Sequence, residues 1–431
     1  MLDNPYLYAA VKEVISKIIN DPVYGFIHIP FQVLFDLIEH PFFQRLRRIR
    51  QLGLTHLVYP GAQHTRFQHS LGALHLMNSA IAVLREKGII ISEKEAEAVS
   101  IAILLHDIGH GPFSHTLEHS LVEGINHEDL SILFMEQLNE EFGGKLDLAI
   151  RIFKGQYDKK FLHQLVSGQL DMDRLDYLKR DSFFTGVTEG TIGLDRIIEM
   201  INVKNDQLVV DEKGIYSIEK FLIARRLMYW QVYLHKTVLS AELLLMKILK
   251  RAKELTSEGV SLFVTSAMKY FLEQNINYNS VFGNNPNHQK VDLLKNFACL
   301  DDNDILTSAK IWAEENDIVL SLLCKRLLNR YLFRAKLQKE KFDDKLLEGL
   351  YKKVMKEYKI PADLTSYFVF MEVISNYAYD PDDHSIQIFY KDGSLRDISE
   401  ASDILNTSVL SKTIKKYCLC YPKELEILNY K

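Results

Sequence analysis

Four side chains that can bind a metal or transfer a proton lie close together in the segment LLHDIGHGPFSH (104–115). They are His106, Asp107, His110 and His115, which span ten residues. Neutral imidazole and carboxylate groups suit divalent Mn, Fe, Zn, Co or Ni. The same side chains could instead form a hydrogen-bonded turn without chemistry. The metal interpretation therefore requires further ligands from other parts of the chain.

The histidines of this chain are concentrated in one region. Of 15 histidines, nine fall within 72 residues, at positions 56, 64, 69, 75, 106, 110, 115, 119 and 127. An isolated buried histidine usually has a structural role, and we interpret His56, His64, His75 and His119 in that way, although His64 lies next to a candidate binding segment. The other five histidines, at positions 69, 106, 110, 115 and 127, indicate a functional cluster.

Helix geometry restricts how the adjacent pair His106 and Asp107 can act together. Side chains of consecutive helical residues diverge by about 100°, so both can reach one ion only near a helix end. Gly109, Gly111 and Pro112 oppose helix continuation and predict that end. Two other segments offer more ligands: HTRFQHSLG (64–72) with His69, and QLDMDRLDYLKRD (169–181) with Asp171 and Asp173.

Helical periodicity predicts the elements that would position these residues. Apolar residues recur at helical spacing over four segments, 70–86, 94–106, 129–142 and 217–256. Two hairpins are expected, at 205–218 with a Glu-Lys-Gly turn and at 384–398 with an Asp392-Gly393 turn. The Asn-rich stretch 274–289 is expected to be a surface loop.

These patterns predict a mostly α fold with a helical core and a smaller mixed α/β C-terminal region. We expect three parts: an N-terminal segment packing on the core (1–39), the core itself (40–260), and a C-terminal helical region with a small β-hairpin (261–431). A length of 431 residues is sufficient for this organisation.

Composition excludes several classes of protein. Apolar residues make up 47% and charged residues 25%, which is typical of a soluble globular protein. The net charge of -5 argues against general nucleic-acid binding but allows a local basic pocket. No apolar run approaches the roughly 18 residues of a membrane span. The four cysteines lack a disulfide-scaffold spacing, so we expect a cytoplasmic protein with no membrane contact.

Three motifs together resemble the HD-domain phosphohydrolases, and within them the deoxynucleoside triphosphate (dNTP) triphosphohydrolases. The motifs are RFQHSLG (66–72), LLHDIGHGPFSH and LDMDRLDYLKRDS (170–182), and the resemblance extends from residue 17 to about 240. It implies a helical HD core that binds a divalent metal. By motif, the ligands would be His69, His106, Asp107 and Asp173. Asp171 is the rival for the last position, and we expect it to cap the helix instead.

The resemblance also assigns roles in proton transfer and phosphate binding. It implies that His110, His115 and His127 line the phosphate pocket, with His127 as the catalytic histidine. His115 is the alternative for protonating the leaving group. Glu118 would orient one of these rings, although many family members have Asp at this position.

For the substrate, the resemblance implies a set of sugar and phosphate contacts. Tyr177 and Leu52 would pack against the deoxyribose and leave no room for a 2′-hydroxyl. Leu234 stands where the family has Gln, so base preference cannot be transferred, and Tyr229 and Trp230 could equally be core aromatics. Arg174 replaces a family Lys. The full expected set is Gln51, Leu52, Arg66, Arg174, Tyr177, Asp181, Arg225, Tyr233 and Lys236.

The implied activity is hydrolysis of a dNTP at the α-phosphate, giving a deoxynucleoside and inorganic triphosphate, with Mg also bound to the phosphates. A homo-oligomer, dimer or tetramer, activated by a dNTP or GTP, is a further implication. Its effector residues would be Gln44, Arg47, Arg330 and Arg334, which could equally be solvated or interface charges. Two alternatives stay open: another HD phosphohydrolase, such as a nucleotidase or phosphodiesterase, and a non-catalytic nucleotide-binding regulator.

Overall fold

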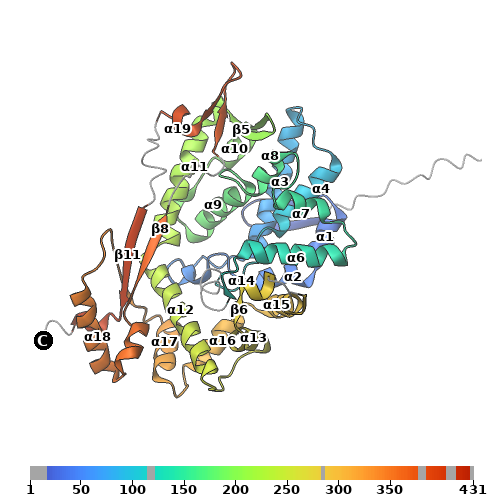
Figure 1. The fold of residues 1–431 in the computed structure, drawn as a ribbon. Coiled ribbons are helices and arrows are strands. Elements are labelled where there is room, and N and C mark those ends of the chain that lie inside the picture. Colours follow the sequence, from blue (N-terminus) through green and yellow to red (C-terminus); the bar gives the residue numbers. More distant parts are fainter. Residues whose placement is uncertain (1–16, 114–121, 283–286, 377–384, 404–413, 428–431) are drawn as a thin grey trace, which may run out of the picture.

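The computed structural model describes residues 17–113, 122–282, 287–376, 385–403 and 414–427. Helices dominate and the sheets are small, which confirms the predicted fold class (Figure 1). The helices of the first half are α1 (Gln32–Glu39), α2 (Pro41–Gln44), α3 (Arg66–Glu86), α4 (Glu93–Leu105), α6 (His127–Glu141), α7 (Asp147–Phe153), α8 (Lys160–Val166), α9 (Met172–Thr185), α10 (Leu194–Met200) and α11 (Ile215–Met228).

Helix α3 is the centre of the HD core, because α4 and α9 pack directly against it. Buried residues cover nearly all of its faces, so it has no continuous polar side. Side-chain capping fixes where the surrounding helices begin. Thr65 and Gln68 form a capping box at the start of α3, and Ser92 and Glu95 do so at α4. The capping box at the start of α3 therefore fixes the helical turn that contains His69.

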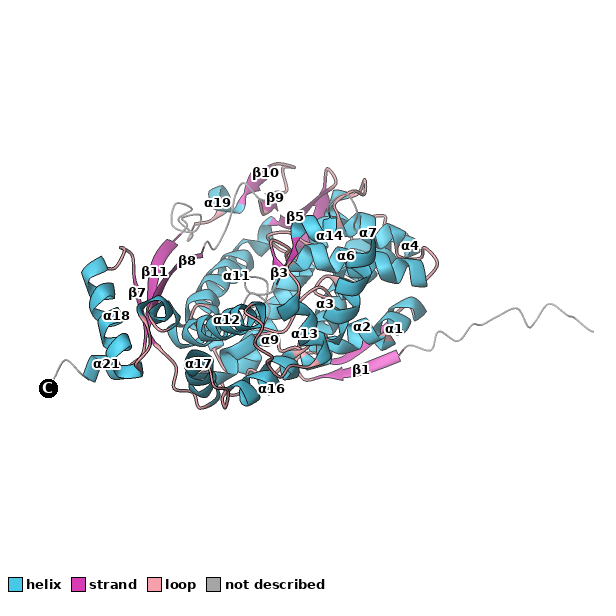
Figure 2. Cartoon of the chain, turned by 60° about the horizontal axis from the view of Figure 1, so that its bottom comes forward, coloured by secondary structure: helices cyan, strands magenta, loops and turns pink. Residues whose placement is uncertain are grey.

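The second half of the chain adds a helical layer, below the HD core in Figure 1, and a C-terminal sheet to its left. In the sheet, β11 pairs antiparallel with both β7 and β8, and α18 lies beside it (Figure 2). The elements are α12 (Lys236–Ser257), α13 (Ser266–Glu273), α15 (Asn287–Cys299), α16 (Asp302–Trp312), α17 (Ile318–Leu328), β7 (Arg334–Gln338), α18 (Asp344–Tyr358), β8 (Phe370–Asn376), β11 (Ile414–Tyr421) and α21 (Glu424–Ile427).

One predicted hairpin is confirmed and the other is displaced. Strands β9 (Gln387–Phe389) and β10 (Leu395–Asp397) pair around Gly393, whose φ of 86° suits a tight turn. The first hairpin instead joins β4 (Ile201–Lys204) to β5 (Gln207–Asp211), and α11 begins where its second strand was expected. Asn205 and Asp206 make its turn in the left-handed region, which these short polar side chains tolerate.

The predicted helix 217–256 and the predicted loop 274–289 also differ from the structure. A π-helical turn, Tyr229–Tyr233, follows α11, and His235 then caps α12 by accepting a hydrogen bond from the amide of Thr237. The expected loop contains β6 (Ile276–Asn277), which pairs with β3 (Val122–Glu123), then α14 (Tyr278–Phe282) and the start of α15. Both errors occur where contacts with distant segments decide the local conformation.

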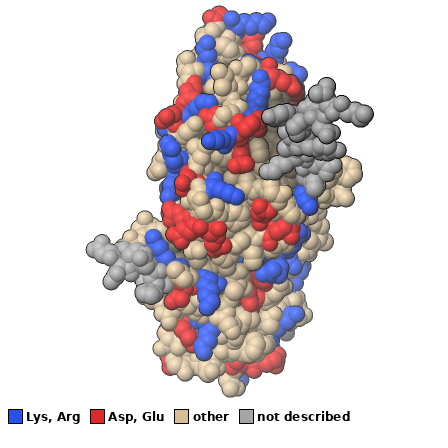
Figure 3. All heavy atoms as spheres, turned by 90° about the vertical axis from the view of Figure 1, so that its right-hand side faces the viewer, with Lys and Arg blue, Asp and Glu red and all other residues tan. Residues whose placement is uncertain are grey.

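No helix in the described part of the chain is long and apolar enough to cross a membrane. On the face seen in Figure 3, acidic and basic side chains are intermixed and do not gather into one basic area. This distribution agrees with the small net charge of -5. A mixed surface of this kind does not present the broad basic area typical of nucleic-acid binding.

Candidate active site

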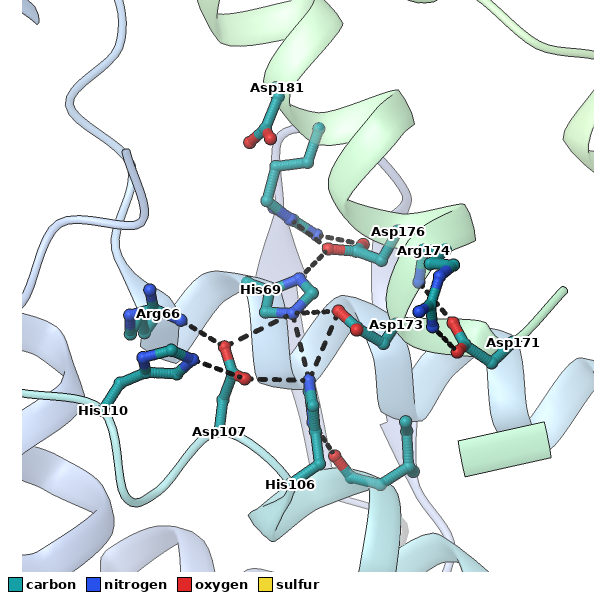
Figure 4. Close-up of polar contacts among 12 residues, drawn as sticks. Arg66, His69, His106, Asp107, His110, Asp171, Asp173, Arg174, Asp176 and Asp181 are labelled. Atoms are coloured by element: carbon teal, nitrogen blue, oxygen red, sulfur yellow. Dashed lines mark hydrogen bonds and ion pairs between the residues drawn. The ribbon is translucent and has the colours of Figure 1, made fainter. Parts of the chain in front are cut away.

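Three potential metal ligands from three helices converge at the centre of the HD core (Figure 4). His69 lies in the first turn of α3, His106 at the C-cap of α4, and Asp173 in the first turn of α9. Oδ1 of Asp173 is 3.1 Å from Nε2 of His69 and 3.4 Å from Nε2 of His106, and the two nitrogens are 3.3 Å apart. Ligands about 2.1 Å from one ion would be separated by similar distances. The three atoms therefore fit a single divalent ion.

Hydrogen bonds to the opposite ring nitrogens orient both imidazoles. Nδ1 of His69 lies 2.7 Å from Asp176, and Nδ1 of His106 lies 2.6 Å from the carbonyl of Ile103. Each Nδ1–H thus has an acceptor, which leaves both Nε2 lone pairs directed at the metal position. Asp176 is itself held by the buried guanidinium of Arg180, at 2.9 and 3.0 Å.

Asp107 adjoins this group but divides its carboxylate among several partners. Its Oδ1 is 3.3 Å from Nε2 of His106 and its Oδ2 is 3.7 Å from Nε2 of His69. Arg66 donates to Oδ2 at 2.5 Å, and His110 contacts Oδ1 at 3.3 Å. Asp107 can therefore serve as a fourth ligand while linking the metal position to Arg66 and His110.

The electrostatics of the cluster favour a bound cation. Burial opposes protonation of His69, but hydrogen bonds to Asp173 and Asp176 outweigh it and raise the pKa of His69 to about 10. Despite burial, contacts with His106 and His69 lower the pKa of Asp173. The carboxylates are thus ionised, and without metal their negative charge holds a proton on the ring of His69. A divalent ion would displace a proton and supply that charge.

The cluster forms part of the wall of a cavity of about 780 Å³. A cavity of this size is sufficient for a nucleotide-sized ligand. Ten of the residues proposed from sequence line it: Gln51, Arg66, His106, Asp107, His110, His127, Asp173, Arg174, Tyr177 and Arg225. The cavity therefore combines the metal position with cationic and aromatic groups.

Two of the proposed histidines stack on each other at the cavity wall. The rings of His110 and His127 are 3.9 Å apart and inclined by 14°. Gly109 makes this possible, because a Cβ there would lie 2.2 Å from the carbonyl oxygen of His127. Burial, followed by the charge of Arg66, lowers the pKa of His110 to about 3. His115 and Glu118 lie outside the described residues.

The remaining expected substrate residues occupy different surroundings. Arg174 lines the cavity and contacts Asp171, which caps α9 by accepting a hydrogen bond from the amide of Arg174 at 2.7 Å. Asp181 is buried away from the cavity wall, and Leu52 packs against the core without lining the cavity. Lys236 is exposed at the start of α12 and does not line the cavity either.

Comparisons with known proteins place the chain in a family. A family model described as the HD domain matches residues 66–181, and one described as an HD associated region matches residues 192–265. YwfO of Bacillus subtilis is 34% identical over 425 residues, which cover 95% of this chain and 93% of that protein. The chain belongs to the HD-domain phosphohydrolase family.

Two further comparisons extend this result. A crystal structure of a phosphohydrolase from Bacteroides thetaiotaomicron is 56% identical, with a TM-score of 0.90, over 94% of this chain and 99% of that one. The deoxynucleoside triphosphate triphosphohydrolase SAMHD1 homolog of Dictyostelium discoideum is 33% identical over 263 residues, 56% of this chain. The matched region spans only 50% of that relative.

The four expected effector residues of this HD-domain phosphohydrolase lie outside the cavity wall and have partners within the chain. Arg47 donates to Gln44 at 2.8 Å and lies over the ring of Phe67. Arg330 donates to the carbonyl of Leu57, and Arg334 on β7 pairs with Glu426. Gln44 and Arg47 thus lie in one part of the chain, and Arg330 and Arg334 in another.

Sequence reasoning missed several residues that support the HD site. Asp176 was not assigned a role, although its spacing of four residues from Arg180 predicts an ion pair on one face of a helix. Arg45 is fully buried and donates to the carbonyls of Ile108 and His110, which holds the turn after α4. Lys154, the C-cap residue of α7, and His163 of α8 also line the cavity. No local pattern identifies Arg45, since its partners lie about 63 residues away.

Proposed function

We propose that this HD-domain phosphohydrolase hydrolyses dNTPs at the α-phosphorus and releases a deoxynucleoside and inorganic triphosphate. The observation that carries the proposal is one cavity that combines the His69, His106 and Asp173 group with Arg66, Arg174, Arg225 and the ring of Tyr177. A metal group alone fits any phosphohydrolase, whereas an aromatic ring and three guanidinium groups suit a nucleoside polyphosphate. The activity named for the Dictyostelium relative supports the same substrate class.

In the proposed reaction, water forms a bond to the α-phosphorus and the bond to the 5′-oxygen breaks. The water loses its proton and the 5′-oxygen gains one. His69, His106, Asp107 and Asp173 would hold a divalent Mn, Fe, Zn, Co or Ni ion, which would supply Lewis acidity, and Mg²⁺ would accompany the triphosphate. Arg66, Arg174 and Arg225 counter the charge that accumulates on the phosphate oxygens.

His127 is the proposed proton donor to the departing 5′-oxygen. It lines the cavity at the start of α6 and stacks on His110. His110, with a pKa lowered to about 3 by burial and by Arg66, is neutral at pH 7 and is suited to hydrogen bonding with a phosphate oxygen. The stacked pair therefore divides proton donation and phosphate contact between two rings.

The effector site is a separate part of the proposal. We propose that a dNTP or GTP bound near Gln44, Arg47, Arg330 and Arg334 activates a homo-oligomer, because separate elements bearing these residues could meet between subunits. Adding a second, non-hydrolysed nucleotide should then raise the initial rate and the oligomer mass measured by light scattering. A rate that depends on substrate alone would contradict activation.

The reaction is tested by incubating the purified protein with Mn²⁺ or Mg²⁺ and each of the four dNTPs, then separating the products by anion-exchange chromatography. Deoxynucleoside and triphosphate in equal amounts support the proposal. Diphosphate or monophosphate products would instead indicate a nucleotidase. Release of nucleotides from a dinucleotide or oligonucleotide would indicate a phosphodiesterase, and tight nucleotide binding without products would indicate a regulator.

A further inference from the structure

A buried hydrogen-bonded chain runs from the segment before α3 to the π-helical turn. Nε2 of His64 is 2.7 Å from Oδ1 of Asp181, and the hydroxyl of Tyr233 donates to Oδ2 of Asp181 at 2.7 Å. The side chain of His64 is fully buried and that of Asp181 is 2% exposed. Asp181 lies near the C-terminal end of α9, away from the metal cluster (Figure 4).

Both ends of this hydrogen-bonded series, His64 and Tyr233, contact residues of the cavity wall. The ring of Tyr233 meets the ring of Tyr177 edge to face at 6.1 Å, and Tyr177 lines the cavity. The carbonyl of His64 accepts a hydrogen bond from the amide of Gln51 at 3.0 Å, and Gln51 also lines the cavity. His64 is thus connected to two residues of the cavity wall, directly to Gln51 and by way of Asp181 and Tyr233 to Tyr177.

The segment that carries His64 packs tightly against α9. The ring of His64 stacks on Phe184 at 4.5 Å with an inclination of 17°. A Cβ at Gly61 would lie 2.4 Å from the carbonyl oxygen of Phe184, so only glycine permits this approach. The imidazole is therefore held in one position, and with it the carboxylate of Asp181.

Packing alone does not explain why a polar side chain occupies position 64. Nδ1 of His64 is buried, and no hydrogen-bond partner for it lies within the described residues. An apolar side chain of similar size would stack on Phe184 without burying an unsatisfied nitrogen. The histidine is thus explained by its bond to Asp181 and not by its contribution to the core.

From this geometry we infer that His64 is a positioning residue for sugar selection: it fixes Asp181, which fixes Tyr233 and through it Tyr177. The inference rests on the proposed function, since it assigns Tyr177 to the deoxyribose. Each carboxylate oxygen of Asp181 has one partner within the protein, His64 on one side and Tyr233 on the other. Selection of 2′-deoxyribose over ribose should depend on each contact of this series, His64–Asp181, Asp181–Tyr233 and Tyr233–Tyr177.

The test measures binding of 2′-deoxynucleoside and ribonucleoside 5′-monophosphates to the Mn²⁺-loaded protein by calorimetry, because these probes lack the triphosphate leaving group. His64→Phe keeps the stacking ring but removes the hydrogen bond. We expect it to reduce the ratio of deoxynucleotide to ribonucleotide affinity by about tenfold. His64→Gln, whose amide can reach Asp181, should keep the ratio within about threefold of the wild type.

A double-mutant cycle and a matched control separate positioning from general stability. Tyr233→Phe breaks the other end of the chain and should lower the ratio similarly, while the double variant His64→Phe, Tyr233→Phe should be little worse than either single variant. His40→Phe removes another histidine–carboxylate contact, 3.0 Å from Glu141 and outside the cavity, and should leave the ratio unchanged. If His64→Phe does not fold, Tyr233→Phe tests whether the contact with Asp181 affects the ratio. A His64→Gln variant whose ratio falls more than about threefold below the wild type would then contradict the role of the His64–Asp181 hydrogen bond.

The inference is overturned if the wild-type protein shows no preference for deoxynucleotides. It is also overturned if the variants lower the affinity for deoxynucleotides and ribonucleotides equally, or if the effects of His64→Phe and Tyr233→Phe on the affinity ratio multiply in the double variant. Product analysis with dNTPs on the same samples tests the proposed function separately. If the wild-type protein prefers deoxynucleotides, the variants reduce that preference as expected, and no triphosphate is released, the proposed hydrolysis is refuted and the role of His64 is supported.

Discussion

In the proposed metal-binding half of the cavity, one nitrogen of each imidazole is bonded to a protein acceptor and the other faces the metal position, whereas in the proposed substrate half charged side chains are paired with one another. Nδ1 of His69 is bonded to Asp176, and its Nε2 faces Asp173. Arg174, in contrast, contacts the buried carboxylate of Asp171. One half is prepared for its ligand, and the other has its charge balanced within the protein.

This difference indicates what each half contributes to binding. A metal ion can enter the first half without rearrangement, because the imidazoles are already oriented. The polyphosphate of the proposed substrate would have to compete with Asp171 for Arg174 and with Asp107 for Arg66. Contacts with phosphate therefore develop at the expense of contacts within the protein, which favours exchange of substrate and product over tight retention.

The largest effect should come from removing the metal ligands. A His106→Ala, Asp107→Ala variant should lose bound metal and all measurable turnover, since two of the four proposed ligands are gone. Metal content by mass spectrometry and circular dichroism check the result, with His40→Ala as the control for a histidine outside the cavity. Retained turnover with an unchanged helical spectrum would contradict the proposed metal site.

Asp176→Asn tests whether the orientation of His69 matters. The amide can present its NH2 group to Nδ1 and favour the wrong tautomer, so we expect metal affinity to fall by about 10–100-fold. Titration with Mn²⁺ measures the change, and high Mn²⁺ should restore kcat. Failure of excess metal to restore kcat would indicate that Asp176 acts on the reaction itself.

Metal binding should also depend on pH in a defined direction. Without metal, burial opposes protonation of His69, but Asp173 and Asp176 raise its pKa to about 10, above its ordinary value near 6.5. A metal must displace this proton, so affinity should weaken by about tenfold per unit as the pH falls from 9 to 7. Calorimetry in buffers of different ionisation enthalpy should detect proton release. Affinity that is independent of pH would contradict a protonated His69.

The smallest effect is expected in the substrate half, at Arg174. Arg174→Lys keeps the positive charge, and since one side of the guanidinium is already used by Asp171, we expect kcat/KM for a dNTP to change by less than about threefold. Arg174→Met, which removes the charge at similar length, is the matched comparison and should cause a larger loss. Equal losses in the two variants would show that the planar fork is required.

Much of the metal site was predictable because its signals are local motifs. The Gly and Pro residues after Asp107 predicted the end of α4, and the acidic start of α9 predicted a ligand there. Partners such as Arg45 and His64 were not predictable, since their contacts depend on tertiary packing. The displaced hairpin shows the same limit, because Asn205 and Asp206 offered turn residues as suitable as Glu-Lys-Gly.

The π-helical turn Tyr229–Tyr233 has a consequence for how this region can change in evolution. A π turn contains one residue more than the α-helical turn it replaces. Deleting that residue would rotate everything after it by about 100° relative to α11. Tyr229, which lines the cavity, and Tyr233, which bonds Asp181, could not then both keep their positions. Relatives that lack the extra residue would have to build this wall from different side chains, so the length of this turn is a marker of how a relative contacts its substrate.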